Sequence, residues 1–371
     1  MLMIDFQKGI VSRGNWFRLR AAMDRAAAGE EVAIGFLGGS ITQGSLSSTP
    51  ETCYAWLVYR WWAEKFANVR YINAGIGGTT SQFGVARVEE DLLRYDPAVV
   101  FIEFSVNDTC DELFRETYEG LVRKVWQSGA AVVLIHNICY DTGFSAEDIH
   151  VQIGKHYDLP CVSVRPTIYA EVMSGRLPNR QITPDDLHPN DAGHALLADA
   201  VRHLLDRVLA SGECQIVTSA LPEPLTANQY ETSIRWQNHN CQPLLEGFIP
   251  DRAPQEHITQ MFRRGFTAWQ TGDKITFRVR GTGIAVQYRK SVRKPAPIAR
   301  VVVDGDPESA LILDANFQED WGDCLYIDTI LTHGKDSCHQ VTIEIIESHP
   351  EDKVPFYLVS VIGSGQVMPG A

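Results

Sequence analysis

Ser40, Asp185 and His188 are residues whose types and spacing could together make a hydroxyl nucleophilic. Asp185 stands three residues before His188, so its carboxylate can fold back and accept the proton of one ring nitrogen. The other ring nitrogen is then available as a base toward a hydroxyl. Ser40 follows Gly38 and Gly39, which leave its hydroxyl almost free of neighbouring side chains. These residues predict nucleophilic catalysis by a serine.

Two further polar segments, residues 73–79 and 105–108, also follow apolar runs. Each signal is weak alone: residues 75–80 miss the G-x-G-x-x-G dinucleotide pattern because position 80 is Thr80, and a lone Asn after a strand is usually a turn residue. Together they occur in chain order at strand ends that a parallel sheet gathers on one edge. We therefore expect them to lie near Ser40.

The elements that must position these residues are alternating strands and helices. Up to about residue 210, short apolar runs alternate with helical patterns, which is typical of a parallel sheet buried on both faces. Strands are predicted at 32–37, 69–73, 98–104, 131–137 and 161–164. Helices are predicted at 16–28, 54–66, 82–94, 113–127, 146–156 and 192–209. The fold class predicted for residues 1–212 is therefore α/β.

The pattern changes after residue 212. Pro222 and Pro224 are followed by segments in which apolar and polar residues alternate, as at 275–280, 284–288, 299–303, 341–345 and 356–361. Turn residues separate these segments, which indicates antiparallel strands with one face in a core. We predict a second domain at 213–371, a β-sandwich or jelly roll.

Length, charge and cysteine content indicate the number of domains, the disfavoured binding partners and the expected location of the protein. A chain of 371 residues favours two domains, and a net charge of −13 opposes binding to nucleic acid or to anionic membranes. There is no apolar run of membrane-spanning length, and residues 1–8 lack the pattern of a secretory signal, so the expected location is the cytoplasm. Eight scattered cysteines are expected to be reduced, mostly buried thiols.

Residues 31–209 resemble the SGNH, or GDSL-type, serine hydrolase superfamily. The resemblance rests on four blocks: Gly38-Gly39-Ser40-Ile41, residues 73–78, Ser105-Val106-Asn107-Asp108, and Asp185-x-x-His188-Pro189. The family implies a flavodoxin-like three-layer sandwich with a five-stranded parallel sheet. The chain departs from the family at two positions: Gly39 stands where the motif that names the family has Asp, and Ser105 where the third block usually has Gly.

The resemblance implies a role for each matching residue. Ser40 is the nucleophile, and Asp185 and His188 complete the triad. The oxyanion hole consists of the backbone N–H groups of Ser40 and Gly78 and the side-chain amide of Asn107. The reaction is acyl transfer from an ester to water, with no cofactor and no metal.

Several neighbouring residues compete for these roles. Asp186 and Asp191 are rival carboxylates, but the three-residue spacing favours Asp185. His194 and His188 could be imagined as metal ligands, although no third ligand stands at a recognisable spacing. Asp108 is expected to cap the segment that follows it.

The order of the two domains resembles that of the mannan 2-O-acetylesterases of gut bacteria. That resemblance implies removal of acetyl groups from plant-derived manno-oligosaccharides, with the second domain selecting the substrate. Trp321 lies in a polar loop and could stack on a sugar ring, or it could pack on its own domain. The alternatives are an acetylxylan esterase, a lipid or thioester hydrolase, a sugar O-acetyltransferase and a non-catalytic carbohydrate-binding protein. A homo-oligomer is left open.

Overall fold

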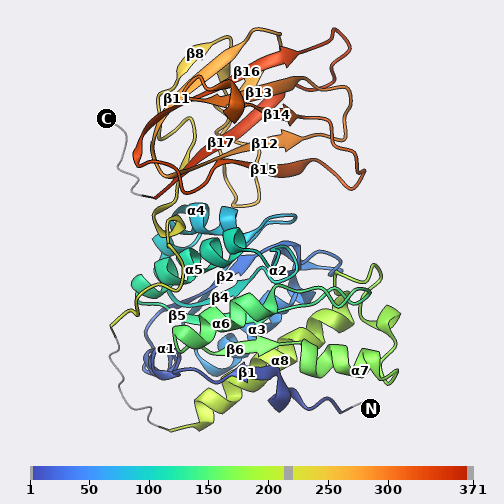
Figure 1. The fold of residues 1–371 in the computed structure, drawn as a ribbon. Coiled ribbons are helices and arrows are strands. Elements are labelled where there is room, and N and C mark those ends of the chain that lie inside the picture. Colours follow the sequence, from blue (N-terminus) through green and yellow to red (C-terminus); the bar gives the residue numbers. More distant parts are fainter. Residues whose placement is uncertain (1–2, 213–219, 366–371) are drawn as a thin grey trace. The chain divides into compact units, whose positions relative to one another are not determined.

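The five apolar runs before residue 212 form five strands of a six-stranded sheet in the computed structural model, which describes residues 3–212 and 220–365. The strand order is β1-β6-β5-β4-β2-β3 (Figure 1). Strands β2 to β6 run parallel, and the short β1 pairs antiparallel with β6. The strands are β1 Ile10–Ser12, β2 Val32–Gly38, β3 Val69–Gly75, β4 Pro97–Glu103, β5 Ala131–His136 and β6 Cys161–Ser163.

Helices cover both faces of this sheet, so the predicted three-layer α/β architecture is confirmed (Figure 1). On one face α1, α3 and α8 share a hydrophobic core with the sheet, and α4, α5 and α6 pack on the other. Every residue of β2 and β5 is buried, as expected for strands between two helical layers. The helices are α1 Phe17–Ala27, α2 Ser40–Gln43, α3 Tyr54–Lys65, α4 Ser81–Asp91, α5 Glu112–Gln127, α6 Glu147–His156, α7 Ala170–Met173 and α8 Asp191–Ala210.

The five-stranded, purely parallel sheet of the sequence prediction needs one correction. The five predicted strands are all present, but β1 adds a sixth strand of opposite direction at one edge. β1 has only three residues, all partly exposed, and therefore lacks the apolar run that reveals the buried strands.

The chain divides into two units, Met1–Asn228 and Gln229–Ala371, so the division falls later than the predicted boundary at residue 212. The cause is a set of hydrogen bonds that bind residues 222–226 to the first unit. Arg123 donates to the carbonyl oxygen of Pro222 (2.7 Å), and the buried carboxylate of Glu119 accepts the backbone N–H groups of Leu225 (2.7 Å) and Thr226 (2.8 Å). Prolines in this segment mark the end of the helical pattern, but they do not mark the end of the unit.

The second unit is a sandwich of two antiparallel sheets, as predicted. One sheet has the order β15-β12-β17-β10-β9, with β7 paired to β17, and the other has the order β14-β13-β16-β11-β8. Apolar side chains from both sheets form one core. The finer description as a jelly roll stays a prediction. The strands are β7 Ile234–Trp236, β8 Leu244–Glu246, β9 Ile249–Pro250, β10 Phe266–Ala268, β11 Lys274–Gly281, β12 Gly283–Lys290, β13 Ile298–Val303, β14 Leu311–Asp314, β15 Cys324–Leu331, β16 Ser337–Glu347 and β17 Phe356–Ser364.

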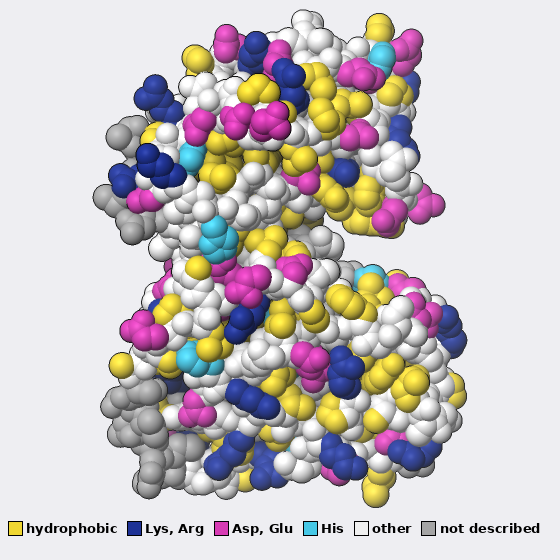
Figure 2. Space-filling view, viewed as in Figure 1, with side chains coloured by type: hydrophobic (Ala, Val, Ile, Leu, Met, Phe, Trp, Pro, Cys, Tyr) yellow, Lys and Arg dark blue, Asp and Glu magenta, His cyan; other side chains and the backbone are white. Residues whose placement is uncertain are grey.

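Charged side chains of both signs are interspersed over the face of each unit seen in Figure 2. Within the described residues, no helix is long and apolar enough to cross a membrane. The described cysteines are free thiols, but the expectation that they are mostly buried is wrong, because Cys110 and Cys338 are exposed and Cys139 and Cys241 are partly so. Cys214 lies outside the described residues.

Candidate active site

Ser40 begins helix α2 directly after strand β2, at the carboxyl edge of the sheet. In the strand order, β2 lies between β3 and β4, so the chain leaves β2 toward one side and later returns on the other. Open α/β sheets bind their ligands at such a switch point, because the loops after neighbouring strands diverge there. Ser40, Gly78 and Asn107 follow β2, β3 and β4 respectively, which brings the first three predicted blocks together.

The structure joins Ser40 to the distant pair Asp185 and His188. His188 Nε2 lies 2.8 Å from Ser40 Oγ, and His188 Nδ1 lies 2.7 Å from Asp185 Oδ2. Ser40 is 8% exposed, whereas the His188 side chain is 22% exposed. Ser40 is therefore largely buried, and the imidazole beside it is more exposed than the serine. This is the hydrogen-bonded order that lets an imidazole remove a serine proton while a carboxylate stabilises the resulting charge.

The Asp185 carboxylate is held by the turn that carries the histidine. Its Oδ1 atom accepts the backbone N–H groups of His188 (2.7 Å) and Leu187 (3.1 Å), while Oδ2 is left for the ring. Partial burial raises the pKa of Asp185, but the hydrogen bonds from the His188 ring and from the two backbone groups lower it more, and the net shift is downward. A lowered pKa favours the ionised form of Asp185, which is the form that can stabilise a protonated imidazole.

The two rival carboxylates have other partners. Asp186 has a left-handed backbone (φ 66°), and its side chain bonds to Asn179 and to Arg180, whose Nη2 lies 2.6 Å from Oδ2. Asp191 begins α8 and accepts Ser48 N and Ser48 Oγ (2.8 and 2.6 Å), as well as the hydroxyl of Thr52. The spacing argument that favoured Asp185 agrees with the geometry.

The two loops that carry the predicted oxyanion donors Gly78 and Asn107 lie beside Ser40. A Cβ on residue 39 would overlap Asn107 Oδ1, so the Asn107 amide lies against the backbone next to Ser40. A Cβ on Gly77 would lie 3.6 Å from Ser40 Cβ, which places the loop after β3 beside the serine as well. The Gly77 N–H is already donated to Gln43 Oε1 at 2.6 Å, whereas Gly78 is exposed with a left-handed backbone (φ 67°). This favours the N–H of Gly78 as the donor.

Gln43 is a residue that the sequence interpretation missed. Its side chain reaches from α2 to the loop after β3 and fixes that loop beside the serine. The position three residues after a nucleophile, on the same helical turn, is a signal that could have indicated it.

Both ring nitrogens of His194 have hydrogen-bond partners within the fold. Its Nδ1 atom accepts the backbone N–H of Tyr54 (3.3 Å), and its Nε2 atom lies 3.2 Å from the carbonyl oxygen of Ser45, so both ring nitrogens are used. Burial lowers the pKa of His194 to about 4, which keeps the ring neutral. Among the described residues, no group of three or more His, Cys, Asp or Glu side chains is arranged to hold a metal ion.

The expectation that Asp108 caps the segment after it is wrong. Helix α5 is capped by Asp111, whose carboxylate accepts Phe114 N at 3.1 Å. Asp108 instead accepts Ser81 N at 2.9 Å, at the start of α4. Trp321 belongs to the second unit: its side chain is 57% exposed, its ring packs edge-on against Phe317, and its indole N–H is donated to Glu319.

The sequence pattern of the GDSL-like lipase/acylhydrolase family matches residues 36–196. A crystal structure of a two-domain esterase active on acetylated mannans is 55% identical, covers 98% of this chain and 99% of its own, and superposes with a TM-score of 0.96. The chain belongs to the GDSL-like lipase/acylhydrolase family. The same relative co-crystallised with mannopentaose gives a TM-score of 0.94 at the same identity and coverage.

A more distant relative is a thioesterase 1/protease 1/lysophospholipase L1 of Escherichia coli (strain K12). It is 28% identical over 186 residues, which make up 47% of this chain and 83% of that protein. The likeness to the mannan-active esterase spans both units, whereas the likeness to the Escherichia coli enzyme spans half of the chain.

Proposed function

We propose that this protein is a serine esterase that removes O-acetyl groups from acetylated manno-oligosaccharides, with the 2-O-acetyl group as the target. The observation that carries the proposal is the 2.8 Å contact between Ser40 Oγ and His188 Nε2, two residues that lie within the part of the chain matched by the family, residues 36–196. The likeness over nearly the full chain to an esterase active on acetylated mannans supports the substrate class.

The proposed reaction has two halves. His188 Nε2 takes the proton of Ser40 as Oγ attacks the acetyl carbonyl, and Asp185 stabilises the imidazolium. The N–H groups of Ser40 and Gly78 and the amide of Asn107 stabilise the oxyanion, each such donor being worth about 10²- to 10³-fold in rate. When the tetrahedral intermediate collapses, the bond between the acetyl carbon and the sugar oxygen breaks, His188 gives its proton to that oxygen, and Ser40 is left acetylated. Water, activated by the same imidazole, then releases acetate and restores the serine.

The second unit is proposed to supply sugar recognition. More than half of the Trp321 side chain is exposed, and an exposed indole face can stack on the apolar face of a pyranose. We expect Trp321→Ala to raise KM for acetylated manno-oligosaccharides several-fold and to leave hydrolysis of 4-nitrophenyl acetate unchanged, because that ester has no sugar. Phe317→Ala, which removes the ring that packs against Trp321, is a matched variant expected to have a smaller effect of the same kind.

The test of the proposal is incubation with acetylated mannan, xylan and pectin oligosaccharides, followed by mass spectrometry for loss of acetyl groups. Loss from mannan and none after Ser40→Ala is the expected result. Loss from xylan alone would contradict the mannan assignment and favour an acetylxylan esterase, while full activity of Ser40→Ala would contradict the triad. Action in the cytoplasm on imported oligosaccharides is part of the proposal, and fractionation of the cells that make the protein tests it.

A lipid or thioester hydrolase is the second candidate, favoured by the likeness to the Escherichia coli thioesterase/lysophospholipase. Turnover of acetyl and octanoyl esters of the same alcohol separates the two candidates, because a lipid hydrolase prefers the longer chain. An acetyltransferase would instead pass the acetyl group to an added acceptor sugar, which product analysis detects. A non-catalytic carbohydrate-binding protein would bind the oligosaccharides and release no acetate.

A further inference from the structure

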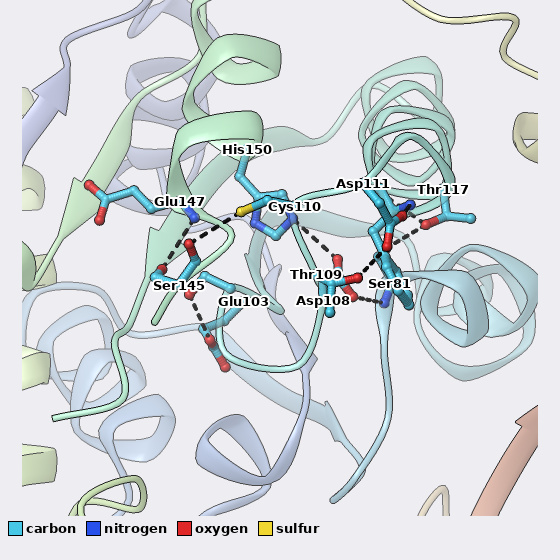
Figure 3. Close-up of polar contacts among 12 residues, drawn as sticks. Ser81, Glu103, Asp108, Thr109, Cys110, Asp111, Thr117, Ser145, Glu147 and His150 are labelled. Atoms are coloured by element: carbon cyan, nitrogen blue, oxygen red, sulfur yellow. Dashed lines mark hydrogen bonds and ion pairs between the residues drawn. The ribbon is translucent and has the colours of Figure 1, made fainter. Parts of the chain in front are cut away.

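Four fully buried polar side chains lie behind the predicted oxyanion donors and take no part in the proposed reaction. They are Ser81, Asp108, Thr117 and His150, here called the Asp108 cluster, and each has a relative exposure of 0%. Each comes from a different element: the start of α4, the loop after β4, the middle of α5 and the middle of α6 (Figure 3). Apolar side chains would fill such a space at lower cost, so the polar groups need a reason.

Asp108 is the centre of this cluster. Its Oδ1 atom accepts the backbone N–H of Ser81 at 2.9 Å, and its Oδ2 atom lies 3.2 Å from His150 Nε2 (Figure 3). The Ser81 hydroxyl is hydrogen-bonded in turn to the hydroxyl of Thr117 at 2.7 Å. The His150 ring is stacked on the ring of Tyr118, with centroids 3.5 Å apart and planes at 6°, which fixes the orientation of Nε2.

Asp108 and Ser81, which are joined by a hydrogen bond, stand close in sequence to the two predicted oxyanion donors. Asn107 immediately precedes Asp108, and Gly78 stands three residues before Ser81. One carboxyl group therefore ties the loop after β4 to the loop after β3. We propose that Asp108, oriented by His150, is a positioning residue that sets the spacing between the Asn107 amide and the Gly78 N–H. This inference rests on the proposed function, since both groups serve there as oxyanion donors.

The electrostatics of the pair fit a geometric role. Burial raises the pKa of Asp108 and lowers the pKa of His150, so the neutral form is favoured on each. A neutral pair still provides both hydrogen bonds of Asp108, the one to Ser81 N that links the loops and the one to His150 Nε2 that orients the carboxyl group. None of the hydrogen bonds described for the cluster includes Ser40, Asp185 or His188, so loss of Asp108 should affect the oxyanion donors and leave the triad intact.

Asp108→Ala and Asp108→Asn test the proposal through kcat and KM for 4-nitrophenyl acetate. The alanine variant should lower kcat about 10- to 100-fold and change KM less than about twofold, because misplaced donors lose transition-state stabilisation alone. Asparagine keeps an oxygen for Ser81 N and can donate its amide to neutral His150, so it should recover kcat to within about threefold of the wild type. An alanine variant with wild-type kcat, or an asparagine variant as poor as alanine, would overturn the proposal.

A double-mutant cycle with Asn107→Ala separates positioning from a general loss of structure. If Asp108 acts through the Asn107 amide, the cost of Asp108→Ala should fall by about tenfold once that amide is absent. If the loss of kcat in the double variant equals the product of the losses in the two single variants, the proposal is overturned. Thr117→Val is the matched control, because it removes a buried hydroxyl of the same cluster and leaves both hydrogen bonds of Asp108 in place. It should lower Tm and leave kcat unchanged.

His150→Phe keeps the proposal testable if Asp108→Ala does not fold. Phenylalanine preserves the stack on Tyr118 and removes the nitrogen that orients Asp108, so kcat should fall several-fold at unchanged KM. An unchanged kcat in a folded His150→Phe variant would contradict the inference. Ser40→Ala is measured alongside: a normal kcat there overturns the proposed function itself, whereas an inactive Ser40→Ala with a fully active Asp108→Ala overturns only the positioning role.

Discussion

Two neighbouring aspartates in the turn that precedes His188 have different partners. Asp185 and Asp186 are both aspartates, yet only Asp185 reaches the imidazole, because the left-handed backbone of Asp186 directs its carboxylate toward Asn179 and Arg180. Asp tolerates that backbone region better than most residues do, so the second aspartate suits the turn. Its side chain then stabilises the segment from which Asp185 projects.

This difference predicts opposite outcomes for two conservative substitutions. Asp185→Asn removes the charge that stabilises the imidazolium, so kcat for 4-nitrophenyl acetate should fall about 10³- to 10⁴-fold with the fold intact. Asp186→Asn keeps the turn, since Asn also adopts the left-handed conformation, and should retain kcat within about threefold. Equal losses in the two variants would show that the turn, and not the Asp185 charge, governs the rate.

The sequence was informative about the triad because most of it is local. Asp185 and His188 are three residues apart, and their spacing alone favours the contact that the structure has. The Asp108–His150 pair spans 42 residues, and each partner taken singly is typical of a cap or a core histidine. Its pairing depends on the packing of α6 against the loop after β4, which no local pattern encodes.

Among the elements, the turn from β2 into α2 leaves little room for side chains at its two glycines. A Cβ on Gly39 would overlap only the end of the Asn107 side chain, which can rotate away, whereas a Cβ on Gly38 would overlap the backbone oxygen of Glu103 and the hydroxyl of Thr42. The two adjacent glycines are therefore needed for different reasons. Gly38 allows β2 and α2 to pack, and Gly39 leaves room for the Asn107 amide.

Alanine at each position should separate activity from stability. Gly39→Ala displaces the Asn107 amide and should lower kcat at least about tenfold, with little change in Tm. Gly38→Ala forces backbone to move and should lower the free energy of unfolding by about 1–3 kcal/mol. Steady-state kinetics and thermal unfolding of both variants check this. A Gly39→Ala variant with normal kcat would mean that the Asn107 amide is not needed in the position it has.

The start of α8 is held by Asp191, and this contact predicts a dependence on pH. Hydrogen bonds from the Ser48 side chain and backbone and from Thr52 lower the pKa of Asp191 to about 2. A carboxyl whose pKa is lowered by folding stabilises the protein above its unfolded value, near 3.9, and loses that contribution as the pH falls toward about 2. The Tm difference between wild type and Asp191→Asn should be largest above pH 4 and shrink below it. A difference independent of pH would contradict the ionic origin of this contact, and kcat near pH 7 should be unchanged.

Strands were predicted well from the sequence where both faces of the strand are buried. The central strands are continuous apolar runs and were identified to within about two residues at their ends, a normal uncertainty for boundaries. The edge strand β1 and the short strands β7 to β10 are two or three residues long, and most of their residues are partly or fully exposed. Their pairing is decided by neighbouring strands and not by their own composition.

At the scale of the whole molecule, chain length and the pattern of apolar and polar residues correctly indicated two units, one α/β and one β. The boundary between them was placed too early because residues 220–228 have the proline-rich, polar composition of a linker. Their backbone nevertheless satisfies the buried carboxylate of Glu119. Residues 220–228 thus have the composition of a linker, although they are hydrogen-bonded to the first unit and belong to it.

Two truncations of the chain test this assignment. Burial raises the pKa of Glu119, but hydrogen bonds from Thr226, Tyr157 and Leu225 lower it more, so the bound form is the carboxylate. A fragment of residues 1–212 lacks the donors from Leu225 and Thr226, and charged hydrogen bonds of this kind contribute about 2–4 kcal/mol together. We expect its Tm to lie roughly 5–10 °C below that of residues 1–228.

The longer fragment should also hydrolyse 4-nitrophenyl acetate, since it contains the triad and the three oxyanion donors. Glu119→Gln in that fragment weakens the same contacts without shortening the chain, and should give a Tm between the two. Equal Tm values for the two fragments would mean that residues 220–228 add nothing to the stability of the first unit. The boundary would then belong near residue 212, where composition alone had placed it.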